Sequence, residues 1–485
     1  MGSMQVYLQK KSGEKMNKFS YKNLLKDSFI FAVGSFGSKV IVFFLIPYYT
    51  FYISKDDFGT YDLINTSVNL VFPIITLAIY ESTLRFNLEE NTDKSSILSN
   101  SIFIFVIGSI FTLAASTLSI IIFNLNIMIS ISTCLLILLN AFQKILVQYI
   151  RGIKKVKLFV INGVIISILT SLMSILLVGV LKLELKGILY ASMISIFISN
   201  IYLLKFSNLY KMIQVSKIDF SMLKNMLKYS IPLIPNTLSL WITSSSNRFF
   251  ILFFLGSSSN GLFAVAYKFA AIMTLINSFF FQAWQIVASE QYTSKNRNEI
   301  YENVFKYFSF IMITAGSLLI IIVKPLFEMV TDDAYSSAWK LVPYLIVGSI
   351  ISGFSSFVGT NYSAAKNTVG VFKTTIIGAI INTILCIILI PINGLYGVCI
   401  SFALSYFVIF VVRINDTNKI LKSNQSFFST YVLILILFMQ ASIRILELNV
   451  YLQYVFQVIL FFSITYSFKG NYKKIAVNIK KKRVS

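Results

Sequence analysis

Five ionisable side chains stand inside long apolar runs of this chain: Lys39, Asp62, Lys144, Arg248 and Lys268. Ionisable groups at such positions are costly and usually functional. Lys39 lies eleven residues from either end of its run, which on a helix is about 16 Å and too far for full snorkelling. A cation at that depth is suited to neutralising a phosphate or an acidic sugar. The alternative is a buried structural pair with Asp62.

The run 60–83 carries a polar stripe that includes three candidate binding residues, Asp62, Asn65 and Asn69. Their spacing places them on one narrow face of a helix, as is typical of a helix that lines a water-filled cavity. Asp62 has two alternative roles. It pairs with a cation, or it binds an H⁺ or Na⁺ ion that drives transport.

One acidic and one basic residue follow near the other end of the same run. Glu81 and Arg85 are spaced i, i+4, which predicts an exposed ion pair. Such an exposed pair contributes little to stability. The alternative, a role in gating or substrate entry, is what the family resemblance of the motif Glu81–Phe86, described below, implies.

The remaining candidates are basic or amide residues in later runs. Lys144 lies close enough to the inner interface for snorkelling, which is the rival to substrate binding. Arg248 lies about 100° round the helix from Asn247 and is expected to face a neighbouring helix. Lys268 is near the outer end of its run. These four residues complete the predicted substrate-binding set.

The elements that must position these residues are membrane-spanning helices. Of the 485 residues, 56% are hydrophobic and 13% are charged, and the mean hydropathy is +0.77. This composition predicts an all-α integral membrane protein, since a span needs about 20 apolar residues. We expect fourteen spans, at 28–50, 60–83, 98–123, 127–150, 158–181, 187–204, 229–255, 260–287, 304–323, 338–358, 370–391, 396–412, 427–446 and 450–468.

The composition also excludes several function classes. The chain has no histidine, and Cys134, Cys386 and Cys399 stand singly in apolar runs, so we expect no metal site, no disulfide framework and no cofactor. The net charge of +23 comes from basic loops between apolar runs. A nucleic-acid partner is therefore not expected.

The basic residues predict the topology. With the N-terminus inside, the inner loops and termini hold 32 Lys and Arg, and the outer loops hold 6. This asymmetry follows the positive-inside rule. Both termini are therefore expected to be cytoplasmic.

An internal repeat predicts two lobes. Phe58-Gly59-Thr60-Tyr61 aligns with Asn260-Gly261-Leu262-Phe263 at an offset of 202 residues. Since both halves start inside, they are expected to be related by an axis along the membrane normal, with the substrate site between them and alternating access by rocking. The predicted segments are a cytoplasmic N-terminal segment 1–27, an N-lobe 28–204, a linker 205–228, a C-lobe 229–412, two extra helices in 413–468 and a basic tail 469–485.

Four short motifs carry a family resemblance: Phe58–Asp62, Glu81–Phe86, Tyr149–Gly152 and Asn247–Lys268. With them the chain resembles the polysaccharide-transporter (Wzx-type) flippases of the multidrug/oligosaccharidyl-lipid/polysaccharide (MOP) superfamily. It departs from the family pattern at Asn247, where an aspartate often precedes the arginine.

The resemblance implies that the chain moves a lipid-linked oligosaccharide, usually on undecaprenyl pyrophosphate, across the bacterial plasma membrane for capsule or O-antigen synthesis. Implied partners are membrane lipid, that substrate and other polysaccharide-assembly proteins. The alternatives are a cation-coupled multidrug exporter, which would favour an acidic cavity, and a membrane-embedded polymerase. A polymerase would need a large outer loop or an acidic motif at a membrane face, so we expect that the protein is not an enzyme.

Overall fold

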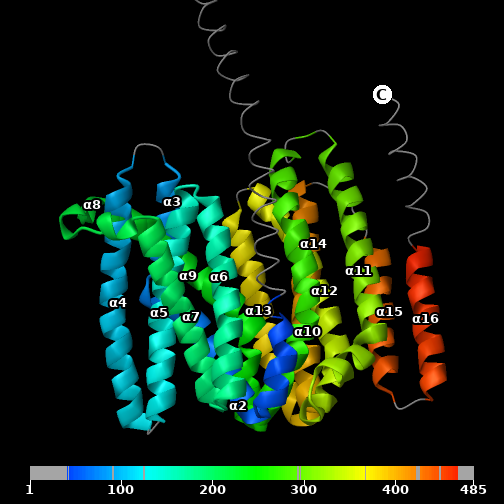
Figure 1. Cartoon of the computed structure of the whole chain (residues 1–485). Coiled ribbons are helices and arrows are strands. Elements are labelled where there is room, and N and C mark those ends of the chain that lie inside the picture. The colour runs from blue at the N-terminus through cyan, green and yellow to red at the C-terminus, as the bar shows by residue number, and fades with distance from the viewer. Residues whose placement is uncertain are drawn as a thin grey trace, which may run out of the picture. The chain divides into compact units, whose positions relative to one another are not determined.

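The computed structural model (Figure 1) describes residues 41–467, except 42, 90–91, 124–125, 292–293, 295, 366, 422–426 and 447–448. The regular elements in these ranges are helices. Ten helical stretches there are long and apolar enough to cross a membrane, and one bent pair would make eleven. One of the ten, Phe220–Phe281, covers two predicted spans. The prediction of an all-α, multi-pass membrane protein is confirmed. Lys39 lies outside the described residues.

Contacts divide the chain into two units. Among the described residues, unit 1 consists of those up to Leu45 and of Val68–Ile234, and unit 2 of Ile46–Ser67 and those from Pro235 to Ser467. The segment 205–228, predicted as a linker, thus belongs to unit 1. Residues 46–67 belong to unit 2, although the sequence places them within the N-lobe. Helix α2 (Lys55–Ile75) begins in one unit and ends in the other.

Unit 1 is a helical bundle around a hydrophobic cluster. Tyr149 and Ile150 are fully buried in this cluster, as is Met226. Besides the end of α2, its elements are α3 (Ile79–Asn87), α4 (Lys94–Phe123), α5 (Ile127–Gly152), α6 (Val156–Ser174), the π-helix η1 (Ile175–Val180), α7 (Glu184–Phe206), the short η2 (Leu209–Lys211) and η3 (Val215–Lys217), α8 (Phe220–Ser230) and η4 (Ile231–Leu233).

The predicted span 60–83 is not one continuous helix. Helices α2 and α3 meet at a bend of 64°. Leu77 and Ala78 have positive φ angles of 49° and 48°, a conformation that costs energy in residues with a side chain. Pro73 lies inside α2, one turn before the bend, and removes a helical hydrogen bond. A proline inside a helix favours a bend near its own position, and the structure shows the break three to five residues after Pro73.

Unit 2 contains the remaining helices. In its longest helix, Gly256 has a φ of 83°, and this kink lies between the predicted spans 229–255 and 260–287. Besides residues 46–67, the elements of unit 2 are α9 (Ile234–Ser245), α10 (Asn247–Gln291), α11 (Arg297–Val330), η5 (Asp333–Leu341), α12 (Val342–Ala364), α13 (Thr368–Asn393), α14 (Leu395–Leu421), α15 (Phe428–Ile445) and α16 (Val450–Ser467).

Aromatic stacking forms one part of the core of unit 2. The Trp284 and Phe357 rings lie 4.7 Å apart and nearly parallel at 8°, and Phe280 stacks on Phe308 at 4.3 Å. The Trp284 Nε1 donates to the Thr360 hydroxyl at 3.0 Å, so its polar group is satisfied within the core. These contacts pack α10, α11 and α12 against one another.

Candidate functional site

An ion pair joins α2 and α10 inside unit 2. Arg248 Nε lies 2.6 Å from Asp62 Oδ2, and the two side chains are 9% and 16% exposed. The guanidinium also lies over the ring of Tyr267, at 4.9 Å from its centroid. Of the two roles predicted for Asp62, the structure therefore shows pairing with a cation. It also shows that Arg248 faces a neighbouring helix, as predicted. Removing one member of such a buried pair would leave the other charge buried without a partner.

Lys268 lies close to this pair. Its ammonium is 5.9 Å from the centroid of the Phe58 ring, and both Asp62 and Arg248 act on it electrostatically. Asp62 is paired directly with Arg248, and Lys268 is a second cation near this pair. We call these three residues, Asp62, Arg248 and Lys268, the unit 2 charge cluster. Its formal net charge is +1.

Asn247 does not belong to that cluster. Its side chain is 1% exposed, and its Oδ1 accepts hydrogen bonds from Asn382 Nδ2 at 2.8 Å and from Cys386 Sγ at 3.4 Å. These bonds connect the start of α10 to α13. The predicted substrate contact of Asn247 is therefore not available in this conformation, because the side chain is buried and its oxygen is already used.

The residues of the polar stripe on α2 make different kinds of contact. Asn65 donates from Nδ2 to the Tyr61 carbonyl at 3.0 Å, and its side chain is half-buried. The Trp241 indole donates to the Thr66 carbonyl at 3.1 Å and so fastens α9 to α2 within unit 2. Asn69 is exposed and lies in the part of α2 that belongs to unit 1. Of the three predicted binding residues on this helix, only Asn69 presents a largely accessible side chain.

A second charge cluster lies in unit 1. Lys144 on α5 is half-buried, with its Nζ 5.5 Å from the centroid of the Tyr80 ring on α3. Glu81 directly follows Tyr80 on α3, and the exposed Arg151 lies seven residues after Lys144 on the same face of α5, so both charges act on the ammonium. Arg151 also receives support from Gln148, whose Oε1 accepts from Nη1 at 2.9 Å. The unit 1 charge cluster, Glu81, Lys144 and Arg151, repeats the composition of the first: one carboxylate and two cations.

The predicted ion pair between Glu81 and Arg85 is wrong. Arg85 pairs instead with Glu89, with Nη1 and Oε1 3.3 Å apart, and the two side chains are 51% and 42% exposed. Both candidate partners lie four residues from Arg85, so the spacing rule could not choose between them.

Two buried arginines were missed because they were counted as loop charges. Arg413 is 7% exposed and donates to the Ser355 carbonyl at 2.9 Å and to the Thr374 hydroxyl at 3.0 Å. Arg444 is 1% exposed and donates to Gln453 Oε1 at 2.7 Å. A usable signal existed for Arg444, since it lies inside the predicted span 427–446, one helical turn after the polar Gln440.

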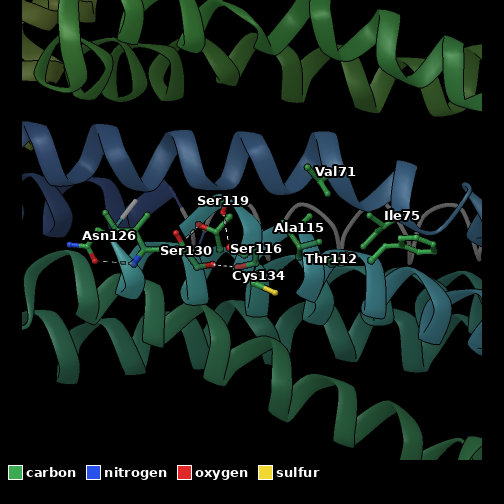
Figure 2. Close-up of a pocket in the computed structure, with 13 residues that line it drawn as sticks. Val71, Ile75, Thr112, Ala115, Ser116, Ser119, Asn126, Ser130 and Cys134 are labelled. Atoms are coloured by element: carbon green, nitrogen blue, oxygen red, sulfur yellow. Dashed lines mark hydrogen bonds between the residues drawn. The ribbon is translucent and has the colours of Figure 1, made fainter. Parts of the chain in front are cut away.

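A cavity of about 570 Å³ lies in unit 1 between α2, α4 and α5. Figure 2 shows its lining side chains, with hydroxyl groups along one side. Thr112 and Thr133 donate to carbonyls of their own helices, so the hydrogen-bond donors of these two hydroxyls are satisfied within the protein. The described lining residues include no charged side chain and none of the predicted site residues. This cavity is therefore separate from both charge clusters.

Solved structures of MOP-superfamily transporters share this fold. The lipid II flippase MurJ in an inward closed conformation matches with a TM-score of 0.66 and 16% identity, over 92% of this chain and 99% of that chain. An inward-facing MATE-family multidrug resistance transporter matches with a TM-score of 0.65 and 13% identity, over 81% and 100% of the two chains. A MOP-superfamily transporter from Pyrococcus furiosus matches with a TM-score of 0.57 and 13% identity, over 82% and 96%. These identities show the fold alone.

The sequence comparison identifies the family. No curated protein matches this chain. The family model described as "Polysaccharide biosynthesis protein" matches residues 24–285, which is more than half of the 485 residues. The matched region includes both charge clusters, and the predicted resemblance to polysaccharide transporters of the MOP superfamily is confirmed. The chain belongs to the polysaccharide biosynthesis protein family and has the fold of the MOP-superfamily transporters.

Proposed function

We propose that this protein is a flippase that moves a lipid-linked oligosaccharide from the inner to the outer leaflet of the bacterial plasma membrane. The carrier lipid is undecaprenyl pyrophosphate, and the product serves the synthesis of capsule, O-antigen or a similar polymer. Both termini are cytoplasmic, as the basic loops indicate. Transport occurs by alternating access and is coupled to H⁺ or Na⁺. Other polysaccharide-assembly proteins are proposed partners.

The observation that carries this proposal is the charge composition of the two clusters. Each cluster contains one carboxylate and two cations: Asp62, Arg248 and Lys268 in one, and Glu81, Lys144 and Arg151 in the other. Ionisable residues in membrane helices are costly and usually functional, so the excess of cations in the two clusters favours the binding of an anion. A diphosphate supplies the missing negative charge.

The membrane potential also favours the export of an anion. An inside-negative membrane potential favours outward movement of each negative charge by about 2.3 kcal/mol per 100 mV. A carrier diphosphate therefore gains energy from the same potential that opposes export of a cationic drug. A multidrug exporter for cations would instead be expected to have an excess of carboxylates at these positions.

Helix α2 supports the alternating-access part of the proposal. It starts in unit 2, continues into unit 1, and is followed by the break at Leu77 and Ala78. A proline and a break within five residues interrupt the regular hydrogen-bond pattern, so the bend can change there more easily than in a continuous helix. We propose that this break is the hinge of the transport cycle.

The function is tested in proteoliposomes with a fluorescent lipid-linked oligosaccharide whose outer-leaflet fraction is read by a membrane-impermeant quencher. We expect translocation by the parent protein, a loss of at least tenfold in Lys144→Ala and Lys268→Ala, and recovery in the corresponding arginine variants. Lys182→Ala is the matched control, since that lysine is exposed. H⁺ or Na⁺ gradients imposed separately identify the coupling ion. Movement of a cationic dye in place of the oligosaccharide would overturn the proposal.

A further inference from the structure

The segment that begins in the last turn of α7 is rich in lysine and packs on one end of unit 1. It runs from Lys205 through η2 and η3 to the end of α8 at Ser230. Its charged residues are Lys205, Lys211, Lys217, Asp219, Lys224 and Lys228. Figure 1 shows α8 lying crosswise to the long helix α4. An amphipathic helix in this orientation is suited to the plane of a membrane surface and not to crossing it.

Hydrogen bonds and apolar packing fix how the segment lies on the bundle. Ser96 Oγ donates to the Lys217 carbonyl at 2.6 Å. Asn100 and Asp219 exchange two bonds of 3.1 Å, from Asn100 Nδ2 to the Asp219 carbonyl and from the Asp219 amide to Asn100 Oδ1. Leu223 and Met226, one turn apart on α8, are buried in the core of unit 1. The opposite face of the segment must therefore point outward.

The Asp219 carboxylate is already used. Its Oδ1 accepts from the Ser221 and Met222 amides at 2.8 and 3.1 Å and so caps the start of α8. The exposed lysines Lys211, Lys224 and Lys228 thus face outward beside an acid that is committed to the helix terminus. The outward face carries an excess of positive charge.

Large apolar side chains accompany these lysines. Val215 is 86% exposed, and Phe220 is 69% exposed although one edge of its ring meets Phe103 of α4. Tyr210 and Tyr229 are about half exposed. Lysines together with exposed apolar and tyrosine side chains form the pattern that binds at the boundary between lipid headgroups and acyl chains. We call this outward face the α8 surface.

We propose that the α8 surface binds the anionic phospholipid headgroups of the inner leaflet, with Val215 and Phe220 inserted among the acyl chains. The negative cytoplasmic leaflet complements its positive charge. The assignment to that leaflet rests on the orientation proposed above. The proposal assigns a lipid-binding role that is distinct from substrate transport. It implies that the α3–α4 end of unit 1 is held at a fixed depth.

The test uses the full chain in nanodiscs of phosphatidylcholine with increasing fractions of phosphatidylglycerol. A spin label is attached to the Val215→Cys variant. Its depth is measured from its collisions with oxygen, which concentrates in lipid, and with a nickel complex, which stays in water. The native cysteines are buried, and the labelled parent protein measures their background. We expect the label to move from aqueous to lipid exposure as phosphatidylglycerol increases. Because both leaflets of a nanodisc contain this lipid, the result does not depend on orientation or transport.

Charge variants sharpen the test. A lysine near an anionic membrane strengthens attachment about fivefold. The variant Lys211→Gln/Lys224→Gln/Lys228→Gln is therefore expected to need a clearly higher phosphatidylglycerol fraction for the same label depth. The control Lys182→Gln/Lys186→Gln changes exposed lysines elsewhere in unit 1 and is expected to behave as the parent. Water exposure of the label at every lipid composition would overturn the proposal. Lipid-like exposure of the label in native membranes, but in no nanodisc, would also overturn the proposal, because it would identify a protein as the partner.

Discussion

Gly59 on α2 and Gly261 on α10 lie against each other at a backbone-to-backbone crossing within unit 2. A Cβ on Gly59 would stand 2.0 Å from the carbonyl oxygen of Ser257, and a Cβ on Gly261 would stand 2.0 Å from that of Lys55. Ser257 is the equivalent of Lys55 at the repeat offset of 202 residues. The contact is thus reciprocal, as an axis of twofold pseudosymmetry requires. The arrangement is what the predicted duplication leads one to expect.

Gly59→Ala is expected to destabilise the protein, because a methyl group cannot be accommodated against a carbonyl at 2.0 Å without separating the helices. Overpacking of this kind costs about 1–3 kcal/mol and sometimes more. The midpoint of thermal unfolding in detergent, followed by size-exclusion fluorescence, measures the effect. Ser259→Ala on the partner helix α10, where the side chain is half-buried, is the control. An unchanged midpoint for Gly59→Ala would show that the crossing is not tight.

The Asp62–Arg248 pair predicts strong non-additivity. Asp62→Asn and Arg248→Met are each expected to cost about 3–5 kcal/mol, because each leaves an unpaired partner in a buried place. The double variant is expected to cost clearly less than the sum. Glu302→Gln at the exposed Lys306–Glu302 pair is the control and should change stability by about 1 kcal/mol or less. Additive costs in the double-mutant cycle would contradict the direct pair.

Arg444 is expected to hold the hairpin of α15 and α16 together. Its guanidinium donates to Gln453 Oε1 at 2.7 Å and to the Tyr454 hydroxyl at 3.1 Å. Arg444→Ala leaves a void and two unsatisfied partners and should cost about 3 kcal/mol or more. Hydrogen exchange over residues 428–467 should accelerate in this variant. Arg85→Ala, at an exposed pair, is the matched control. Unchanged protection of the hairpin would refute the structural role.

Acid should weaken the attachment of the α8 segment. Asp93 accepts from Lys217 Nζ at 3.1 Å, and this hydrogen bond lowers the pKa of Asp93 below its usual value of 3.8. Because the folded-state pKa is the lower one, the stabilisation is present above pH 3.8 and is lost as pH falls through the folded pKa. The difference in melting temperature between the parent and Asp93→Asn should shrink below about pH 4. The two side chains are about half exposed, so the difference at neutral pH should be small.

Lys39 carries a prediction that comes from the sequence. In a deletion strain, Lys39→Ala is expected to block polymer export and to cause lipid-linked intermediates to accumulate, whereas Lys39→Arg restores export, because either cation can neutralise a phosphate. Immunoblotting confirms equal protein levels, and Lys182→Ala serves as the exposed control. Normal export by the alanine variant would show that Lys39 is merely tolerated in its span.

Local sequence signals predicted much of the fold. Apolar runs of about 20 residues identify membrane helices because only a helix satisfies its backbone within one segment of lipid-embedded chain. The same reasoning failed at Leu77 and Ala78, where neither residue type signals a left-handed backbone. It also failed at Arg413, which follows the last residue of a predicted span but is buried by α12 and α13.

The sequence by itself determined the class of molecule, the approximate helices, the repeat at offset 202 and the residues that needed partners, because hydropathy and spacing are properties of neighbouring residues. Only the tertiary structure decided which partners they have. Asp62 needed a cation and Arg248 needed a facing helix, yet 186 residues separate them. The choice of Glu89 for Arg85, the burial of Arg444 and the allocation of α2 to two units depend on packing between distant helices, which no local pattern encodes.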